Sequence, residues 1–322
     1  MAALTLPLAS QALDFGPNGE FSLTGFAEEG YRRTQSRLHI EGGRLHSDAT
    51  DRSYGVGRLE LVSLAELRDR TRDLQGAGPM RMGEVVGDAR QLHANAAHAR
   101  ATFQVASQFN LLEMVSPNIT PEHGIAGYEH DPTQGPACAI AAGAGTIYRN
   151  YFASVGDQQG QTAARQLDGL ADIGAELCRQ LGVPSGTLWQ MRNGYALPDQ
   201  AHLRQIDMHL RRLDEPARDA LRGLLRVGFH ADVEVTEEGA APGTLVSQIY
   251  CSALPVSYSG IPAPLWSQFA TLILEAAYEA TLRAAVLNAS MREAQSRAVA
   301  SSMLRLAHSR NFARTSSNDS AR

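Results

Sequence analysis

The chain has 322 residues, of which 43% are apolar, and a formal net charge of −5. This composition predicts a globular protein and excludes a chain that is mainly disordered. There is no strong nucleic-acid signal, and the absence of lysine excludes a P-loop lysine, a Schiff-base lysine and a lysine general base.

Cysteine usage and hydropathy indicate the compartment. Cys138, Cys178 and Cys251 are odd in number and show neither CxxC spacing nor a disulfide pattern, which favours a reducing environment. No apolar run reaches the length of a membrane span, and the first residues lack the pattern of a secretory signal. We therefore expect a cytoplasmic protein with no membrane partner.

Residues 1–80 are expected to form a segment that packs on the core. Short apolar alternations between residues 37 and 62 predict small antiparallel strands. Ser63-Leu64-Ala65-Glu66 is a capping box and predicts a helix that ends near Leu74.

Two apolar segments that end in polar residues follow. Residues 83–88 and 101–106 are predicted to be buried strands, with Asp88 closing the first and Asn110 following the second. If these strands are parallel neighbours, both side chains lie at one rim of the sheet, where ligands bind. The alternatives are that Asp88 caps a helix or turn and that Asn110 bonds its own backbone in a turn.

A long loop, residues 113–133, precedes a helix that is predicted to begin at Pro136. Loops of this length are usually functional or disordered, and the apolar anchors of this one argue against disorder. Its histidines lack the spacing of metal ligands, so no metal site is predicted. Its carboxylates are either candidate acids or solvated loop charges: Glu113, Glu122, Glu129 and Asp131.

The remainder alternates between helices and strands. Residues 153–228 are predicted to be a mostly helical insertion that includes a helix over 161–181, and 229–236 and 245–252 to be strands. A long buried helix is predicted over residues 265–288. Residues 291–322 form an atypical tail, with helix-forming residues as far as His308 before it becomes polar.

Three of these segments together carry a resemblance. Gly87-Asp88, the strand FQVASQFN ending at Asn110, and a glycine-containing loop that leads into a helix follow in the order found in the macrodomain and poly(ADP-ribose) glycohydrolase superfamily. FQVASQFNLLEM with TPEHGIAGYEHDPTQGPACAIAAGAGTIYRNYF resembles, more narrowly, a group of macrodomain-like proteins of bacteria and protists. The resemblance covers roughly residues 37–290 and implies a three-layer α/β/α sandwich with a mixed sheet and a helical insertion.

The resemblance also implies a ligand, ADP-ribose or an ADP-ribosylated substrate, and no cofactor. Asp88 would bind the adenine amine, and Asn110 would face the distal ribose with Gln108 beside it. Backbone N–H groups at the start of the helix would hold the diphosphate without a lysine, and they belong to Thr133, Gln134 and Gly135.

Hydrolysis of an ADP-ribosyl linkage is the sharper expectation. An acid near the phosphate loop would protonate the leaving group, and the candidates are Glu122, Glu129 and Asp131. Two departures from the family pattern leave alternatives open: TQGPA replaces the Gly-Gly-Gly loop, and no second glycine-rich loop follows Met291. The alternatives are a binding module without catalysis and a truncated family member that binds no ligand.

Overall fold

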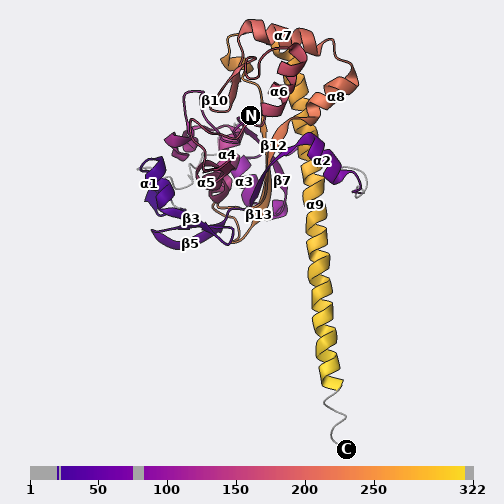
Figure 1. Cartoon of the computed structure of the whole chain (residues 1–322). Helices are drawn as coiled ribbons and strands as arrows, with labels where there is room; N and C mark the ends of the chain where they lie inside the picture. The colour runs from indigo at the N-terminus through magenta and orange to yellow at the C-terminus, as the bar shows by residue number, and fades with distance from the viewer. Residues whose placement is uncertain (1–19, 22, 75–82, 316–322) are drawn as a thin grey trace, which may run out of the picture.

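A four-stranded mixed sheet forms the centre of the computed structural model, which describes residues 20–21, 23–74 and 83–315 (Figure 1). The strand order is β6-β12-β13-β7. β12 runs antiparallel to both β6 and β13, whereas β13 and β7 are parallel. The carboxyl ends of β13 and β7 therefore meet at the same edge of the sheet. The bounds are β6 (Arg58–Ser63), β7 (Thr102–Ser107), β12 (Arg226–Glu234) and β13 (Leu245–Ser252).

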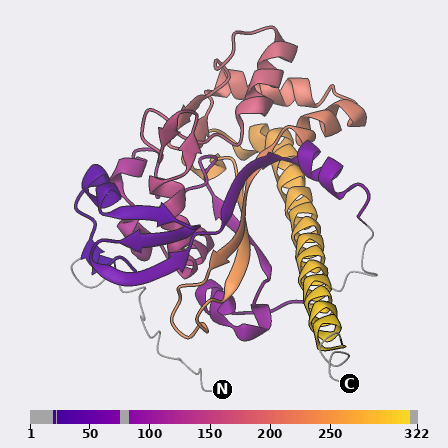
Figure 2. The ribbon, with the colours of Figure 1, turned by 60° about the horizontal axis from the view of Figure 1, so that its bottom comes forward.

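Helices cover both faces of this sheet (Figures 1 and 2). On one face, Asn288 of α9 donates to Ser247 Oγ of β13 at 2.9 Å. On the other, Gly145 of α5 lies against the His230 ring of β12. α2 and α9 belong to the first layer and α3, α4 and α5 to the second. The bounds are α2 (Leu64–Thr71), α3 (Ala89–Ala94), α4 (Gln134–Ala141), α5 (Gly143–Tyr151) and α9 (Ala263–Thr315).

The long helix α9 packs into the large apolar cluster through aromatic residues in its first turns, and alanines are buried further along. Trp266 and Phe269 are at most 1% exposed, and Ala276, Ala280 and Ala284 are fully buried. The small alanine side chains let the helix axis approach the strands closely. Beyond the sheet, the C-terminal part of α9 extends past the other elements (Figure 1).

The predicted insertion contains three helices and two hairpins. α7 and α8 begin at side-chain caps, because Asp199 accepts from His202 N and Asp214 accepts from Ala217 N. Their leucines and isoleucines join the apolar core under α9. The bounds are α6 (Ala171–Leu181), α7 (Gln200–Leu210), α8 (Glu215–Gly223), β10 (Gln190–Arg192) and β11 (Tyr195–Leu197).

The N-terminal segment adds a second, smaller sheet. Three antiparallel strands in the order β3-β4-β5 pack with α5 around a separate apolar cluster that includes Leu38, Leu45 and Tyr151. Short hairpins complete the described chain. The bounds are β1 (Glu20–Phe21), β2 (Phe26–Ala27), α1 (Tyr31–Ser36), β3 (Leu38–Glu41), β4 (Arg44–Ser47), β5 (Thr50–Gly55), β8 (Ser154–Val155) and β9 (Gln158–Gln159).

Several local predictions are confirmed. The capping box that starts α2 is present, with Ser63 Oγ accepting from Glu66 N and Glu66 accepting from Ser63 N. The strands predicted at 101–106, 229–236 and 245–252 are β7, β12 and β13 within a few residues. The long C-terminal helix is also present, and it continues through Met291.

Two predictions are wrong. Residues 83–88 form no strand. They are exposed, and no other strand among the described residues offers them backbone hydrogen-bond partners. The helix predicted over 161–181 begins only at Ala171. Gln161 explains the delay, because its buried side chain bonds the backbone of Asn110, Arg149 and Leu167 and holds this stretch irregular.

These layers define an α/β protein with a mixed sheet. Within the described ranges, none of the helices combines the length and apolar character needed to cross a membrane.

Candidate functional site

A two-lobed cavity opens where the carboxyl ends of β7 and β13 meet. The larger lobe, about 410 Å³, extends along β7 towards α9, and the smaller lobe, about 310 Å³, reaches the first turn of α4. The end of β7 lines both lobes, together with Gln134, Tyr195 and Tyr258. Ligands of open α/β sheets bind beyond the carboxyl ends of the strands, so this cavity is the candidate site.

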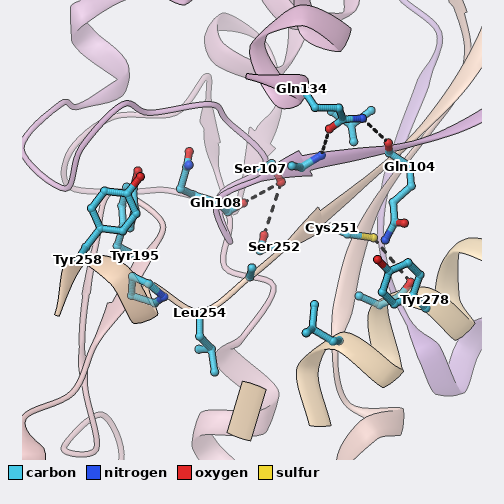
Figure 3. Close-up of a pocket in the computed structure, with 16 residues that line it drawn as sticks. Gln104, Ser107, Gln108, Gln134, Tyr195, Cys251, Ser252, Leu254, Tyr258 and Tyr278 are labelled. Atoms are coloured by element: carbon cyan, nitrogen blue, oxygen red, sulfur yellow. Dashed lines mark hydrogen bonds between the residues drawn. The ribbon is translucent and has the colours of Figure 1, made fainter. Parts of the chain in front are cut away.

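Uncharged polar groups line the larger lobe together with apolar side chains that include Leu254 and Leu274 (Figure 3). Amides come from Gln104, Gln108 and Gln134, and hydroxyls from Ser107 and Ser252. The two serine Oγ atoms are 3.5 Å apart and join the ends of β7 and β13. Such groups can both donate and accept hydrogen bonds, so this lobe suits the neutral polar parts of a ligand.

Two tyrosines stand at the entrance shared by the lobes (Figure 3). The rings of Tyr195 and Tyr258 are nearly perpendicular, with centroids 5.9 Å apart. Tyr195 is fixed, because its hydroxyl donates to Met114 O, and burial raises its pKa to about 12. Tyr258 is 67% exposed and presents a ring on which a planar group can stack.

Gln134 closes the outer edge of β7 with its side chain. Its Oε1 accepts from Ala106 N at 2.9 Å and its Nε2 donates to Gln104 O at 2.8 Å. The amide thereby imitates a neighbouring strand and satisfies two edge groups that would otherwise face water. It also fixes the start of α4 against the end of β7.

The first turn of α4 faces the smaller lobe. The N–H groups of Gln134 and Gly135 have no hydrogen-bond partner among the described residues, and Pro136 has no N–H to offer. Free N–H groups at a helix N-terminus favour an anion. Close packing requires glycine at 135, since a Cβ there would lie 2.3 Å from Ala106 O.

We expect Gly135→Ala to lower the free energy of unfolding by about 1–3 kcal/mol, because the added methyl group overpacks α4 against β7. Gly127→Ala is the control, since a Cβ at Gly127 meets nothing within 4 Å. Urea unfolding of both variants measures the difference. Equal stability of the two variants would contradict the close approach of Gly135 to Ala106.

Two carboxyl groups line the smaller lobe, and they differ in environment. Asp131 is half-buried, and its Oδ1 accepts from Thr133 N at 2.9 Å. Glu113 is 3% exposed, and neither of its carboxyl oxygens has a hydrogen-bond partner among the described residues. Burial therefore raises the pKa of Glu113 to about 7, against the opposing effects of the Arg149 charge and the Tyr128 hydroxyl.

Arg149 is the cation beside Glu113, but it is anchored elsewhere. Its Nη2 is 3.6 Å from Glu113 Oε2. Its Nε donates to Leu111 O at 3.0 Å, and its guanidinium lies 3.8 Å from the centroid of the Tyr250 ring. Because these contacts hold the guanidinium, Arg149 faces Glu113 at a distance longer than a hydrogen bond.

Of the amides predicted to face a ribose, one reaches the cavity. Gln108 lines both lobes, and its Oε1 accepts from Met114 N at 2.5 Å. Asn110 is fully buried and lines neither lobe: its Nδ2 donates to Gln166 Oε1 and its Oδ1 accepts from Leu112 N. Asn110 therefore holds the turn after β7, which is the alternative considered from the sequence.

Asp88 does not join the cavity. It caps α3, where its Oδ1 accepts from Arg90 N at 2.8 Å and Gln91 N at 3.1 Å. It lines neither lobe, because residues 83–88 form no strand that could carry it to the rim of the sheet. Asp88 therefore has the role of a helix cap, which the sequence analysis gave as the alternative.

The three predicted acids are separated. Asp131 lines the smaller lobe, as do the predicted diphosphate-binding residues Thr133, Gln134 and Gly135. Both oxygens of Glu122 accept from Ala163 N, and Glu129 pairs with His130 at 3.4 Å. Neither Glu122 nor Glu129 lines a lobe.

Sequence reasoning missed part of the site. Tyr195, Ser252 and Tyr258 come from segments remote from β7 in the chain, and no local motif marks them. Glu113 was one carboxylate among several in the loop, and only its burial beside Arg149 distinguishes it.

Comparisons with protein-family models, curated proteins and solved structures find no match for this chain. Among the described residues, no three His, Cys, Asp or Glu side chains gather in a way that could hold a metal ion.

Proposed function

We propose that the two-lobed cavity binds ADP-ribose or a related nucleotide diphosphate. The observation that carries the proposal is the joining, in one cavity, of the β7 and β13 carboxyl ends with the free N–H groups of Gln134 and Gly135. Its lobes lie in the size range of small-molecule sites.

Each part of such a ligand has a chemically suitable surface. The diphosphate would accept from the N–H groups at the start of α4, where the helix dipole favours negative charge. The base or a ribose would occupy the larger lobe, whose amides and hydroxyls can both donate and accept. The exposed ring of Tyr258 would stack on the planar base.

Hydrolysis of an ADP-ribosyl linkage is the sharper form of this proposal. Two carboxyl groups, Glu113 and Asp131, line the lobe that contains the anion-binding helix start. A hydrolase requires one such group to move a proton.

Calorimetric titration with ADP-ribose tests the proposal. We expect micromolar binding, which corresponds to about −8 kcal/mol. Tyr258→Ala should weaken it about 5- to 150-fold, since stacking of a base on an aromatic ring contributes about 1–3 kcal/mol. No detectable binding by the folded protein would refute the proposed function.

Asp88→Ala is the informative control for this titration. Because Asp88 caps α3 and lines neither lobe, the variant should bind ADP-ribose as the unmodified protein does, while the loss of the cap lowers stability by about 1 kcal/mol. A large loss of affinity would instead restore the adenine-binding role that the sequence resemblance implies for Asp88.

A further inference from the structure

A row of large apolar side chains crosses the exposed face of α9. They recur at every fourth residue and are 45%, 60%, 55% and 44% exposed: Leu274, Tyr278, Leu282 and Val286. Residues four apart on a helix lie one above the other, so these side chains form one continuous row, here called the α9 ridge. Monomeric proteins rarely leave a large contiguous apolar surface in water, and such surfaces mark contacts with a partner.

The opposite face of α9 already packs within the chain. Ala276, Ala280 and Ala284 are fully buried in the large apolar cluster, so the α9 ridge contributes little to the protein's own core. The C-terminal part of α9 extends past the other elements (Figure 1). A second molecule therefore has room to approach the helix from this side.

The charged side chains beside the α9 ridge are paired within the chain. Glu275 pairs with Arg222 at 2.8 Å. Glu279 pairs with Arg68 at 2.5 Å and with Arg283 at 2.7 Å. A partner recognised by charge, such as a nucleic acid or a basic peptide, would have to compete with these ion pairs. An apolar surface with its charges already paired is typical of contacts between identical copies.

The spacing of the α9 ridge favours a second copy as the partner. Side chains at i, i+4 and i+8 form the rows that interdigitate when two helices cross at about −50°, the commonest class of helix packing. Such packing requires the same spacing on both helices, and a second copy supplies it by symmetry. The two-fold axis would pass between Tyr278 and Leu282, at the middle of the ridge.

The area of the α9 ridge suits a weak dimer. At about 150–200 Å² for each whole side chain, the four half-exposed side chains leave roughly 350 Å² per copy, so that two copies would bury about 700 Å². Exposed neighbours on the same face of the helix add to this area: Thr271, Glu275 and Ala289. The total approaches the roughly 1,200 Å² at which specific, stable interfaces begin.

We propose that the α9 ridge is the contact through which two copies of this protein form a dimer with two-fold symmetry. The inference is independent of the proposed function. Leu274 and Tyr278 also line the larger lobe (Figure 3). In the dimer, the second copy therefore forms part of the outer wall of that lobe.

Sedimentation equilibrium of the full chain tests the dimer. We expect a mass twice that of one chain, with a dissociation constant in the micromolar range because the contact is small. Leu282→Glu should raise the dissociation constant at least about 100-fold, since each copy then places an unpaired carboxylate in the contact. Met208→Glu is the matched control: Met208 is 46% exposed on α7, and its replacement should leave the dimer unchanged.

Disulfide cross-linking locates the contact. Leu282→Cys lies beside the two-fold axis and should join two copies under mild oxidation, whereas Met208→Cys should not. The native cysteines are all buried and should give no cross-link in the unmodified protein: Cys138, Cys178 and Cys251.

Two results would overturn the proposal. The mass of a single chain throughout the micromolar range would show that the occupant of the α9 ridge is not a second copy. A dimer that tolerates Leu282→Glu, or that Met208→Glu weakens equally, would show that the copies meet at another surface. Because association makes apparent stability depend on protein concentration, unfolding of α9 variants is compared below the dissociation constant.

Discussion

Replacing Arg149 with methionine is expected to lower the free energy of unfolding by about 3–5 kcal/mol, because it leaves the buried Glu113 carboxyl without its neighbouring cation. The variant also loses the hydrogen bond to Leu111 O and the contact with the Tyr250 ring. Methionine retains most of the apolar volume of arginine. The decrease in the free energy of unfolding therefore measures lost charge and hydrogen bonding more than the effect of a cavity. Urea denaturation measures it, and a loss below about 1 kcal/mol would show that the pair is unimportant for stability.

The loss should depend on pH in a defined direction. Burial raises the pKa of Glu113 from its ordinary value of 4.5 to about 7, so the folded state binds this proton more tightly than the unfolded state. Stability from this group is therefore fully present below pH 4.5 and is lost as pH rises through about 7, by roughly 3 kcal/mol in total. Arg149→Met removes a cation that lowers this pKa and should destabilise more at pH 8 than at pH 5.

The double variant Arg149→Met/Glu113→Gln isolates the electrostatic part. It removes the ionisable group, so it should be more stable than Arg149→Met at pH 8 and similar to it at pH 5. Burial lowers the pKa of His230 to about 3, so this residue destabilises the fold in acid. Comparing the two variants at the same pH cancels its contribution to their difference in stability. No recovery of stability in the double variant at pH 8 would contradict the coupling between Glu113 and Arg149.

Trp266→Ala should cost about 3–5 kcal/mol and loosen the start of α9. Trp266 is 1% exposed, and its Nε1 donates to Ser259 Oγ at 3.2 Å. The ring thus fixes α9 to the core and to the segment that follows Tyr258 at the cavity entrance. Truncation leaves a large cavity in the apolar cluster to which Trp266 belongs. Thermal and urea unfolding measure the loss.

Leu282→Ala on the same helix is the matched control. Leu282 is 55% exposed, so its truncation removes little buried surface and should change stability by less than about 0.5 kcal/mol. Similar losses for Trp266→Ala and Leu282→Ala would mean that Trp266 does not anchor the first turns of α9 in the apolar core.

Elements with a strong local signal followed from the sequence alone. The Ser63 to Glu66 capping box starts α2. Apolar runs gave the inner strands β12 and β13 and the buried helix α9. In each case the interaction that forms the element lies within it or depends on burial of its apolar face. The local sequence pattern is therefore enough to predict the element.

The failure at residues 83–88 shows the limit of such patterns. An apolar run becomes a strand only where another strand offers backbone partners, and none of the described strands does so here. Asp88 then follows its local chemistry and caps α3. Asn110 likewise serves the turn after β7, because Gln166 and Leu112 satisfy its amide.

The sequence by itself determined the α/β class, the start of α2, and the placing of Gln108, Asp131 and the start of α4 near one strand end. Only the tertiary structure decided which carboxyl is buried. The pKa of Glu113 depends on how far water is excluded and on Arg149 from a later helix, and both are set by packing between elements distant in the chain.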